Sequence, residues 1–149
     1  MKNVVLIGFM GTGKTSSGRL LAGRLGCRFI DIDRKIERES GMTVAEIFAR
    51  HGESYFRQRE KDAIARVARG RGAVIATGGG AVLDAENREC LRASGVIIAL
   101  TASVPVILER TGRRATRPLL ARPDREETVV RLLAERASHY ATADFTLDT

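Results

Sequence analysis

The chain has 149 residues, of which 44% are hydrophobic, so it can bury one core without a metal or disulfide to stabilise it. Its 25 basic and 18 acidic residues give a net charge of +7, which favours an anionic partner. The basic residues are scattered and only 5% of residues are aromatic, so we expect phosphate and carboxylate ligands and no nucleic acid. Neither a membrane-spanning apolar run nor a signal-peptide pattern is present, so we expect no membrane association and a cytoplasmic location.

The two cysteines lie far apart in the sequence, at Cys27 and Cys90. They show neither CxxC nor Cys/His spacing, so we expect no metal site and no disulfide in a reducing compartment. Both are interpreted as reduced, half-buried packing residues.

Short apolar runs alternate with longer amphipathic stretches along the chain, beginning with an apolar run at 3–7 and an amphipathic stretch at 14–25. The strands are nearly all apolar, which is typical of strands buried on both faces of a parallel sheet between helical layers. We therefore expect one α/β domain over residues 1–149. The remaining predicted strands are 28–32, 73–77, 96–101 and 144–147, and the remaining predicted helices are 44–50, 54–68, 85–93, 104–110 and 126–140.

Two pairs of residues have the spacing of a capping box, in which side chains satisfy the free amides at a helix start. They are Thr43 with Glu46 and Asp124 with Glu127. Segment 112–124 is rich in arginine and proline and shows neither a helical nor a strand period. A loop of this length in a compact domain is usually functional, so we predict a mobile lid there.

Residues 8–15 read GFMGTGKT and match the phosphate-loop pattern GxxxxGK[ST] in full, between a predicted strand and a predicted helix. Glycines let backbone N–H groups turn toward phosphate oxygens, and the helix N-terminus adds its positive dipole. Lys14 would reach the β and γ phosphates, and the Thr15 hydroxyl would ligate Mg²⁺. A glycine-rich turn that binds nothing is the alternative, which the motif and its context disfavour. The expected ATP-binding residues of this loop are Gly11, Thr12, Gly13, Lys14, Thr15 and Ser16.

Asp31 and Asp33 close the second predicted strand at a spacing of two, so they share one face or one rim of the sheet. One carboxylate could support the metal shell while the other accepts a hydrogen bond from an attacking hydroxyl. The structural alternative is that Asp33 only caps the helix that follows. The two residues alone leave both interpretations open.

Three further features are weak evidence of function when each is considered alone. Arg57 and Glu60 are three apart on a predicted helix, which favours an ordinary solvated ion pair. Considered alone, Arg136 is interpreted as a solvent-facing residue on an amphipathic helix. The triple glycine at 78–80 follows a predicted strand and suggests backbone that approaches a ligand closely.

Together these segments resemble the shikimate kinase family. The resemblance rests on GFMGTGKT, FIDID, FRQRE, TGGGAV, RPLL and the ER...HY pattern, which occur in the order and at the spacing of that family from the first strand to the last residue. It implies a three-layer αβα P-loop kinase fold with a five-stranded parallel sheet, and transfer of the ATP γ-phosphate to the 3-hydroxyl of shikimate by a monomer. The family continues beyond residue 149 into a final helix, so we expect this helix to be absent and one sheet face to be partly uncovered.

The resemblance also implies the residues that bind the acceptor. Asp33 would bind shikimate hydroxyls and act as a catalytic base or positioner. Arg57 and Arg136 would grip the carboxylate, because a guanidinium can donate paired hydrogen bonds to it, and Glu60 would hold Arg57. The glycines Gly78, Gly79 and Gly80 would line the acceptor site, with the Gly79 N–H facing the substrate.

On the nucleotide side, the resemblance implies that Asp31 lies near Mg²⁺ through water. Arg117 on the lid would contact the ATP phosphates and join Lys14 as a catalytic residue, and Arg110 would lie near the adenine. A gluconate-kinase-like enzyme shares the loop and fold, but paired arginines with a triple glycine speak against it. A catalytically silent ATP-binding module is a third alternative, which the intact set of charged residues disfavours.

Overall fold

The structure is a computed structural model that describes residues 1–112 and 125–149. The described strands form one five-stranded sheet in the order β2-β3-β1-β4-β5, and every neighbouring pair is parallel. The register sets Val5 of the central strand beside Ile75 on one side and Ile97 on the other. The predicted parallel α/β sheet is confirmed. The strands are β1 (Asn3–Ile7), β2 (Arg28–Asp31), β3 (Ala73–Ala76), β4 (Gly95–Thr101) and β5 (Phe145–Asp148).

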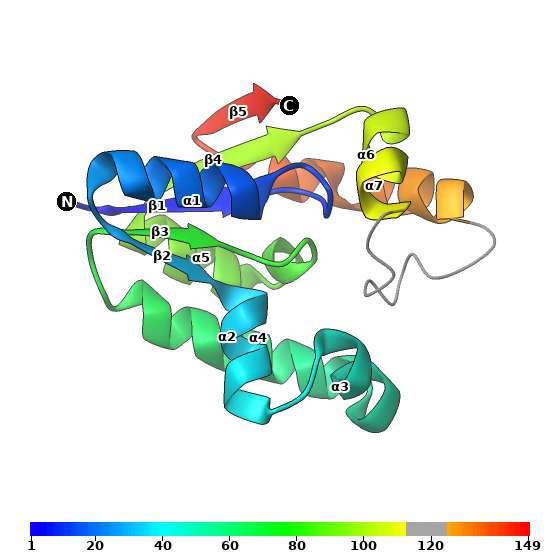
Figure 1. Cartoon of the computed structure of the whole chain (residues 1–149), viewed down its shortest axis with the longest axis horizontal. Helices are drawn as coiled ribbons and strands as arrows, with labels where there is room; N and C mark the ends of the chain where they lie inside the picture. Colours follow the sequence, from blue (N-terminus) through cyan, green and yellow to red (C-terminus); the bar gives the residue numbers. More distant parts are fainter. Residues whose placement is uncertain (113–124) are drawn as a thin grey trace.

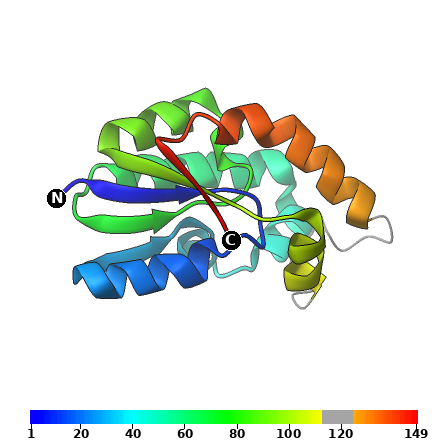
Figure 2. The same ribbon diagram turned by 90° about the horizontal axis from the view of Figure 1, so that it is seen from above.

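Helices cover both faces of the sheet (Figure 1). Helix α1 packs on β1, β2 and β3, whereas α5 packs on β4 from the other face, where α7 also lies (Figure 2). The helices are α1 (Lys14–Leu25), α2 (Ile32–Ser40), α3 (Val44–His51), α4 (Glu53–Ala68), α5 (Ala85–Ser94), α6 (Val104–Gly112) and α7 (Arg125–Tyr140), with a 3-10 turn η1 (Ala81–Leu83).

Successive residues of the central strands point to opposite faces of the sheet. Val5, Ile75 and Ile97 point into the larger core cluster, while Leu6 and Val74 point toward α1 in a smaller one. Strands buried on both faces are what the predicted apolar runs required. The edge strand β5 differs, because its four residues are exposed.

Helix α2 was not among the predicted helices. It begins one residue after Asp31, whose Oδ1 accepts a hydrogen bond from the Arg34 backbone N–H at 3.2 Å. Strand β2 therefore ends at Asp31, one residue earlier than predicted, and Asp31 is the helix cap. The alternative in which Asp33 caps this helix is wrong, since Asp33 lies inside its first turn.

The predicted capping box at the start of α3 is confirmed. Thr43 Oγ1 accepts from the Glu46 N–H at 3.1 Å, and Glu46 Oε1 accepts from the Thr43 N–H at 3.4 Å. At the predicted lid, Gly112 belongs to helix α6. The rest of that lid, with Arg117, and Asp124 of the second predicted capping pair, lie outside the described residues.

Both cysteines are free and partly buried against the core, which confirms their predicted packing role. Within residues 1–112 and 125–149, no helix is both long and apolar enough to cross a membrane.

Candidate active site

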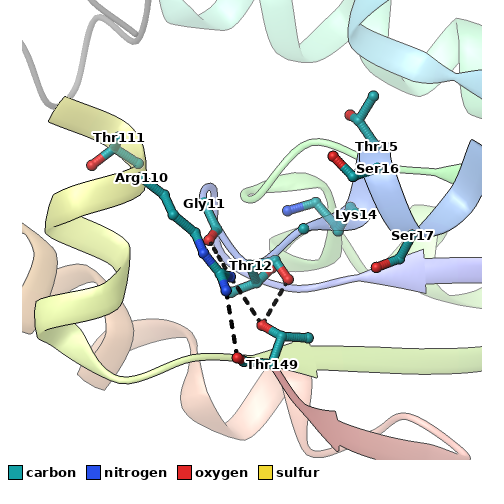
Figure 3. A pocket seen from close by; sticks show the side chains of 10 residues that line it. Gly11, Thr12, Lys14, Thr15, Ser16, Ser17, Arg110, Thr111 and Thr149 are labelled. Carbon is teal, nitrogen blue, oxygen red and sulfur yellow. Dashed lines mark hydrogen bonds between the residues drawn. The ribbon is translucent and has the colours of Figure 1, made fainter. Parts of the chain in front are cut away.

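The loop between β1 and α1 turns through glycines. Gly11 and Gly13 have φ angles of 82° and 94°, which residues with a Cβ rarely adopt, and Gly13 is the cap from which α1 starts. The free N–H groups of the first helical turn therefore face a cleft of about 440 Å³ (Figure 3). Each predicted ATP-binding residue that the structure describes lines this cleft: Gly11, Thr12, Gly13, Lys14, Thr15, Ser16 and Arg110.

Lys14 lies against the inside of this loop. Its Nζ donates to the carbonyl oxygens of Gly8 and Phe9 at 2.6 and 2.8 Å. These contacts hold the ammonium group at the place where the loop would close around phosphate oxygens.

Thr15 and Asp31 together form a candidate metal-binding edge. Thr15 Oγ1 donates to Asp31 Oδ2 at 3.0 Å, so the hydroxyl lone pairs remain available and the carboxylate is fixed nearby. Hydroxyl and carboxylate oxygens are hard ligands, and this donor set fits Mg²⁺ carried by a nucleotide.

Arg110 reaches the phosphate loop from α6. Its Nη1 donates to the Gly11 carbonyl and to Thr149 Oγ1, both at 3.1 Å (Figure 3). Thr149 Oγ1 in turn lies 2.9 Å from the carbonyl oxygen of Thr12. Thr149 was missed by the sequence reasoning, because no local pattern indicates that the residue after β5 meets the phosphate loop.

A second cleft of about 460 Å³ connects the phosphate loop to the predicted acceptor residues. Lys14 and Thr15 line it together with Asp33, Gly78 and Gly79. Asp33, Gly78 and Gly79 also line a third, smaller pocket with Arg57, Glu60 and Arg136. The predicted nucleotide and acceptor residues are thus brought together at the carboxyl ends of the strands, where open parallel sheets bind ligands.

Arg57 and Glu60 form a partly buried pair, in which the Arg57 side chain is 28% exposed. Arg57 Nη1 donates to Glu60 Oε1 at 3.0 Å, and Glu60 is only 1% exposed. Glu53 accepts from Arg57 Nε and Nη2 at 3.3 Å on the solvent side. The interpretation of an ordinary solvated pair is therefore wrong, because α3 and α4 pack together and enclose this part of the helix.

Arg136 is 3% exposed, so the interpretation of a solvent-facing residue is also wrong. Its Nε and Nη1 are buried and have no hydrogen-bond partner among the residues that the structure describes. The guanidinium lies over the Phe9 ring, 5.7 Å from its centroid. A buried cation with unused donors, lining the same pocket as Arg57, is the arrangement that a carboxylate ligand would complete.

The triple glycine packs against three charged side chains of the site itself. A Cβ at Gly78 would lie 2.8 Å from Asp33 Oδ1, one at Gly79 would lie 3.2 Å from Arg136 Nη1, and one at Gly80 would lie 2.5 Å from Arg57 Nη2. The predicted close approach to backbone is present. In the structure, however, the groups that approach are these side chains.

A Gly80→Ala substitution is expected to impair acceptor binding and spare the fold. Gly80 has φ −98° and ψ 0°, which alanine tolerates, so the group that must move is the flexible end of Arg57. We expect the acceptor KM to rise about tenfold, as for loss of one charged hydrogen bond. Steady-state kinetics and thermal melting would check this. Gly23→Ala is the control, because its Cβ would meet nothing within 4 Å; an equal KM rise in both variants would contradict the prediction.

Burial raises the pKa of Glu60 to about 7, against the opposing pull of the Arg57 charge and hydrogen bond. The Asp33 charge raises this pKa further and that of Arg136 lowers it. Glu60 Oε2 is buried without a hydrogen-bond partner in the described part of the chain. The Glu60 carboxyl group therefore titrates between its neutral and charged forms near neutral pH.

This pKa predicts a pH dependence of stability. Between pH 4.5 and about 7 the native state holds a proton on Glu60 that the unfolded chain releases, so the free energy of unfolding falls as pH rises through this window. We expect Glu60→Gln to remove this part of the slope. Urea unfolding of both proteins at pH 5 and pH 8 measures it. Glu39 and Asp84, whose pKa values are lowered, contribute equally to the pH dependence of both proteins. If the unfolding free energy changes equally with pH in the wild type and in Glu60→Gln, the raised pKa of Glu60 is contradicted.

Sequence reasoning missed several residues of the acceptor pocket. Met10, Val44, Phe48 and Phe56 line it, and their apolar character gives no sign that they face a ligand. Tyr140 has no predicted role, although it belongs to the ER...HY pattern. Its hydroxyl donates a hydrogen bond to the carbonyl of Gly79, which lines the pocket.

The phosphate loop opens α1, and the cleft that it lines shares Asp33 and two glycines with a small pocket that holds two arginines. These features define a P-loop kinase of small molecules. A model of the shikimate kinase family matches residues 10–149, and the chain belongs to this family. The shikimate kinase of Caldanaerobacter subterraneus subsp. tengcongensis is 51% identical to it over 148 residues, which cover 99% of this chain and 86% of that protein.

Solved structures agree with this assignment. The chain is similar to shikimate kinase from Acinetobacter baumannii in complex with shikimate, with a TM-score of 0.97 and 41% identity over 100% of this chain and 84% of that one. A gluconokinase from Sinorhizobium meliloti has a TM-score of 0.55 and 20% identity over 99% of this chain and 81% of that one, so it shares the fold alone.

Proposed function

We propose that this protein transfers the γ-phosphate of ATP to the 3-hydroxyl of shikimate. The observation that carries the proposal is the buried guanidinium of Arg136, which lines one pocket with Arg57 and has two donors without a partner in the described part of the chain. That pocket continues past Asp33 to Lys14, so an acid held by its carboxylate could extend a hydroxyl toward the phosphate loop. The relatives named above are shikimate kinases, which supports this choice of acid.

In the proposed reaction, the acceptor hydroxyl oxygen forms a bond to the γ-phosphorus while the bond from that phosphorus to the bridging oxygen of ADP breaks. Asp33 accepts the hydrogen bond of the hydroxyl and takes its proton as the new ester forms. Lys14 balances charge on the phosphate oxygens, and Thr15 and Asp31 would hold Mg²⁺, which neutralises charge during transfer. Because the transition state is loose, positioning and electrostatics supply most of the acceleration.

The rest of the proposal follows the family resemblance. It includes the contact of Arg117 with the phosphates, a monomer and a cytoplasmic location. It also includes Arg110 near the adenine, and this residue lines the same cleft as the phosphate loop.

Release of ADP, measured with shikimate, with gluconate and with no acceptor, tests the proposal. We expect turnover with shikimate only. Turnover with gluconate would select the gluconate-kinase-like alternative, which also acts on a carboxylate-bearing polyol. No turnover with any acceptor, in a protein that still binds ATP, would select the silent module.

A further inference from the structure

The last turn of α7 contacts the triple glycine at a point that the proposed reaction does not use. Tyr140 Oη donates a 2.6 Å hydrogen bond to the Gly79 carbonyl, and both groups are buried. Tyr140 lies one helical turn beyond Arg136, so the two side chains share one face of α7. Gly79 is thus approached by the guanidinium of Arg136 and by the phenol of Tyr140 from the same helix.

This hydrogen bond is the anchor for the middle of the glycine segment. The Gly78 and Gly80 carbonyls accept from the backbone N–H groups of Ala81 and Leu83, each at 3.2 Å. The Gly79 carbonyl accepts from the Tyr140 side chain. Three successive glycines have no side chains to restrict their backbone angles, so a hydrogen bond at the central carbonyl has an unusually large effect on their conformation.

The Gly79 carbonyl is also part of a rigid unit that reaches the acceptor pocket. The peptide plane contains this carbonyl, the Gly80 N–H and the Gly80 Cα, so fixing its oxygen fixes the other atoms. Because Gly80 has no Cβ, Arg57 Nη2 can lie close to its Cα. Tilting this plane would therefore move backbone against one arginine of the pocket, while the other arginine is carried by the same helix as Tyr140.

We infer that Tyr140 is a positioning residue for the acceptor, which orients the Gly79–Gly80 peptide and, through it, the pocket shared by Arg57 and Arg136. Tyr140 does not line that pocket, so it acts without touching the acceptor. Burial raises the pKa of its phenol, which keeps the hydroxyl protonated as a donor. The inference rests on the proposed function, because the acceptor is the acid assigned there.

The test compares two Tyr→Phe variants, which is possible because the chain has two tyrosines. Tyr140→Phe removes the donor to Gly79; Tyr55→Phe, the control, removes the hydroxyl of a half-buried tyrosine, which accepts from Arg59 Nη2 at 2.9 Å. We expect Tyr140→Phe to raise the KM for shikimate about fivefold to thirtyfold, the range of one buried hydrogen bond, with the KM for ATP within about twofold. Tyr55→Phe should change neither constant. Equal rises for both substrates, or no rise, would overturn the inference.

Wild-type turnover in the same experiment separates the two claims, since absence of shikimate turnover there would refute the proposed function itself. A second measurement covers the case in which Tyr140→Phe does not fold. The Tyr55→Phe protein, labelled with 3-fluorotyrosine, carries one fluorine probe at residue 140. Its ¹⁹F resonance should shift on saturation with shikimate and stay in place with ADP alone. The reverse pattern, or no shift with either ligand, would contradict a role in acceptor positioning.

Discussion

An Asp33→Asn variant is expected to lose at least about a hundredfold in kcat, the lower end of the effect of a positioned acid or base, with a nearly unchanged KM for ATP. Asp33 lies in the first turn of α2 and lines both the cleft that reaches Lys14 and the acceptor pocket. Asparagine keeps the shape of the side chain but cannot take up the hydroxyl proton. The cleft around the phosphate loop does not include residue 33, so ATP binding should persist.

Steady-state kinetics with ATP and shikimate varied in turn measures both effects. Asp84→Asn is a matched control, because Asp84 caps α5 by accepting from the N–H groups of Glu86 and Asn87, and asparagine caps a helix equally well. The control should keep wild-type kinetics. Turnover of Asp33→Asn within about threefold of wild type would show that the carboxylate is not needed for the transfer.

The parts that could be predicted from sequence are those that local pattern determines. The spacing of glycines, lysine and threonine in residues 8–15 is enough to predict a phosphate-binding loop. The apolar runs predict a parallel sheet, because few other arrangements bury both faces of each strand. The capping box of Thr43 and Glu46 involves residues three apart, so it too could be predicted. Long-range packing contributes little to any of these features.

Burial could not be predicted in the same way. Arg57, Glu60 and Arg136 lie on helices with many charged residues, and only the packing of those helices decides which charged residues face inward. Helix α2 was not predicted, for a related reason. Its sequence IDRKIERES has two apolar residues, Ile32 and Ile36, and the first of them extends the apolar run of β2. The resemblance to a family supplied what periodicity could not, namely that Arg57 and Arg136 belong to one site.

The contact of Tyr140 with Gly79 shows a further limit. The two residues are 61 apart in the sequence, and a tyrosine at the end of an amphipathic helix is an ordinary core residue. No property of either residue alone indicates that one fixes the backbone of the other. Such positioning becomes visible only when the strand, the 3-10 turn and the last helix are seen together.

Replacing Arg136 by methionine is expected to separate acceptor binding from stability. The shikimate KM should rise by about tenfold to a hundredfold or more, because a charged hydrogen bond in a desolvated site contributes about 1.5–3 kcal/mol. The ligand-free protein should change in stability by less than about 1 kcal/mol, since the removal of two buried donors without a partner among the described residues offsets the lost attraction to Glu60 and the lost contact with the Phe9 ring. Urea unfolding and steady-state kinetics measure the two changes.

Arg131→Met is the matched control on the same helix, because Arg131 is 60% exposed and its ion pair with Glu135 is 3.9 Å long. It should alter neither the shikimate KM nor the unfolding free energy by more than a few tenths of a kcal/mol. Saturating shikimate should raise the melting temperature of the wild type and of this control but not that of Arg136→Met. A strongly destabilised Arg136→Met protein that still binds shikimate would mean that the buried guanidinium serves the fold, and the carboxylate would then have to be held by other residues.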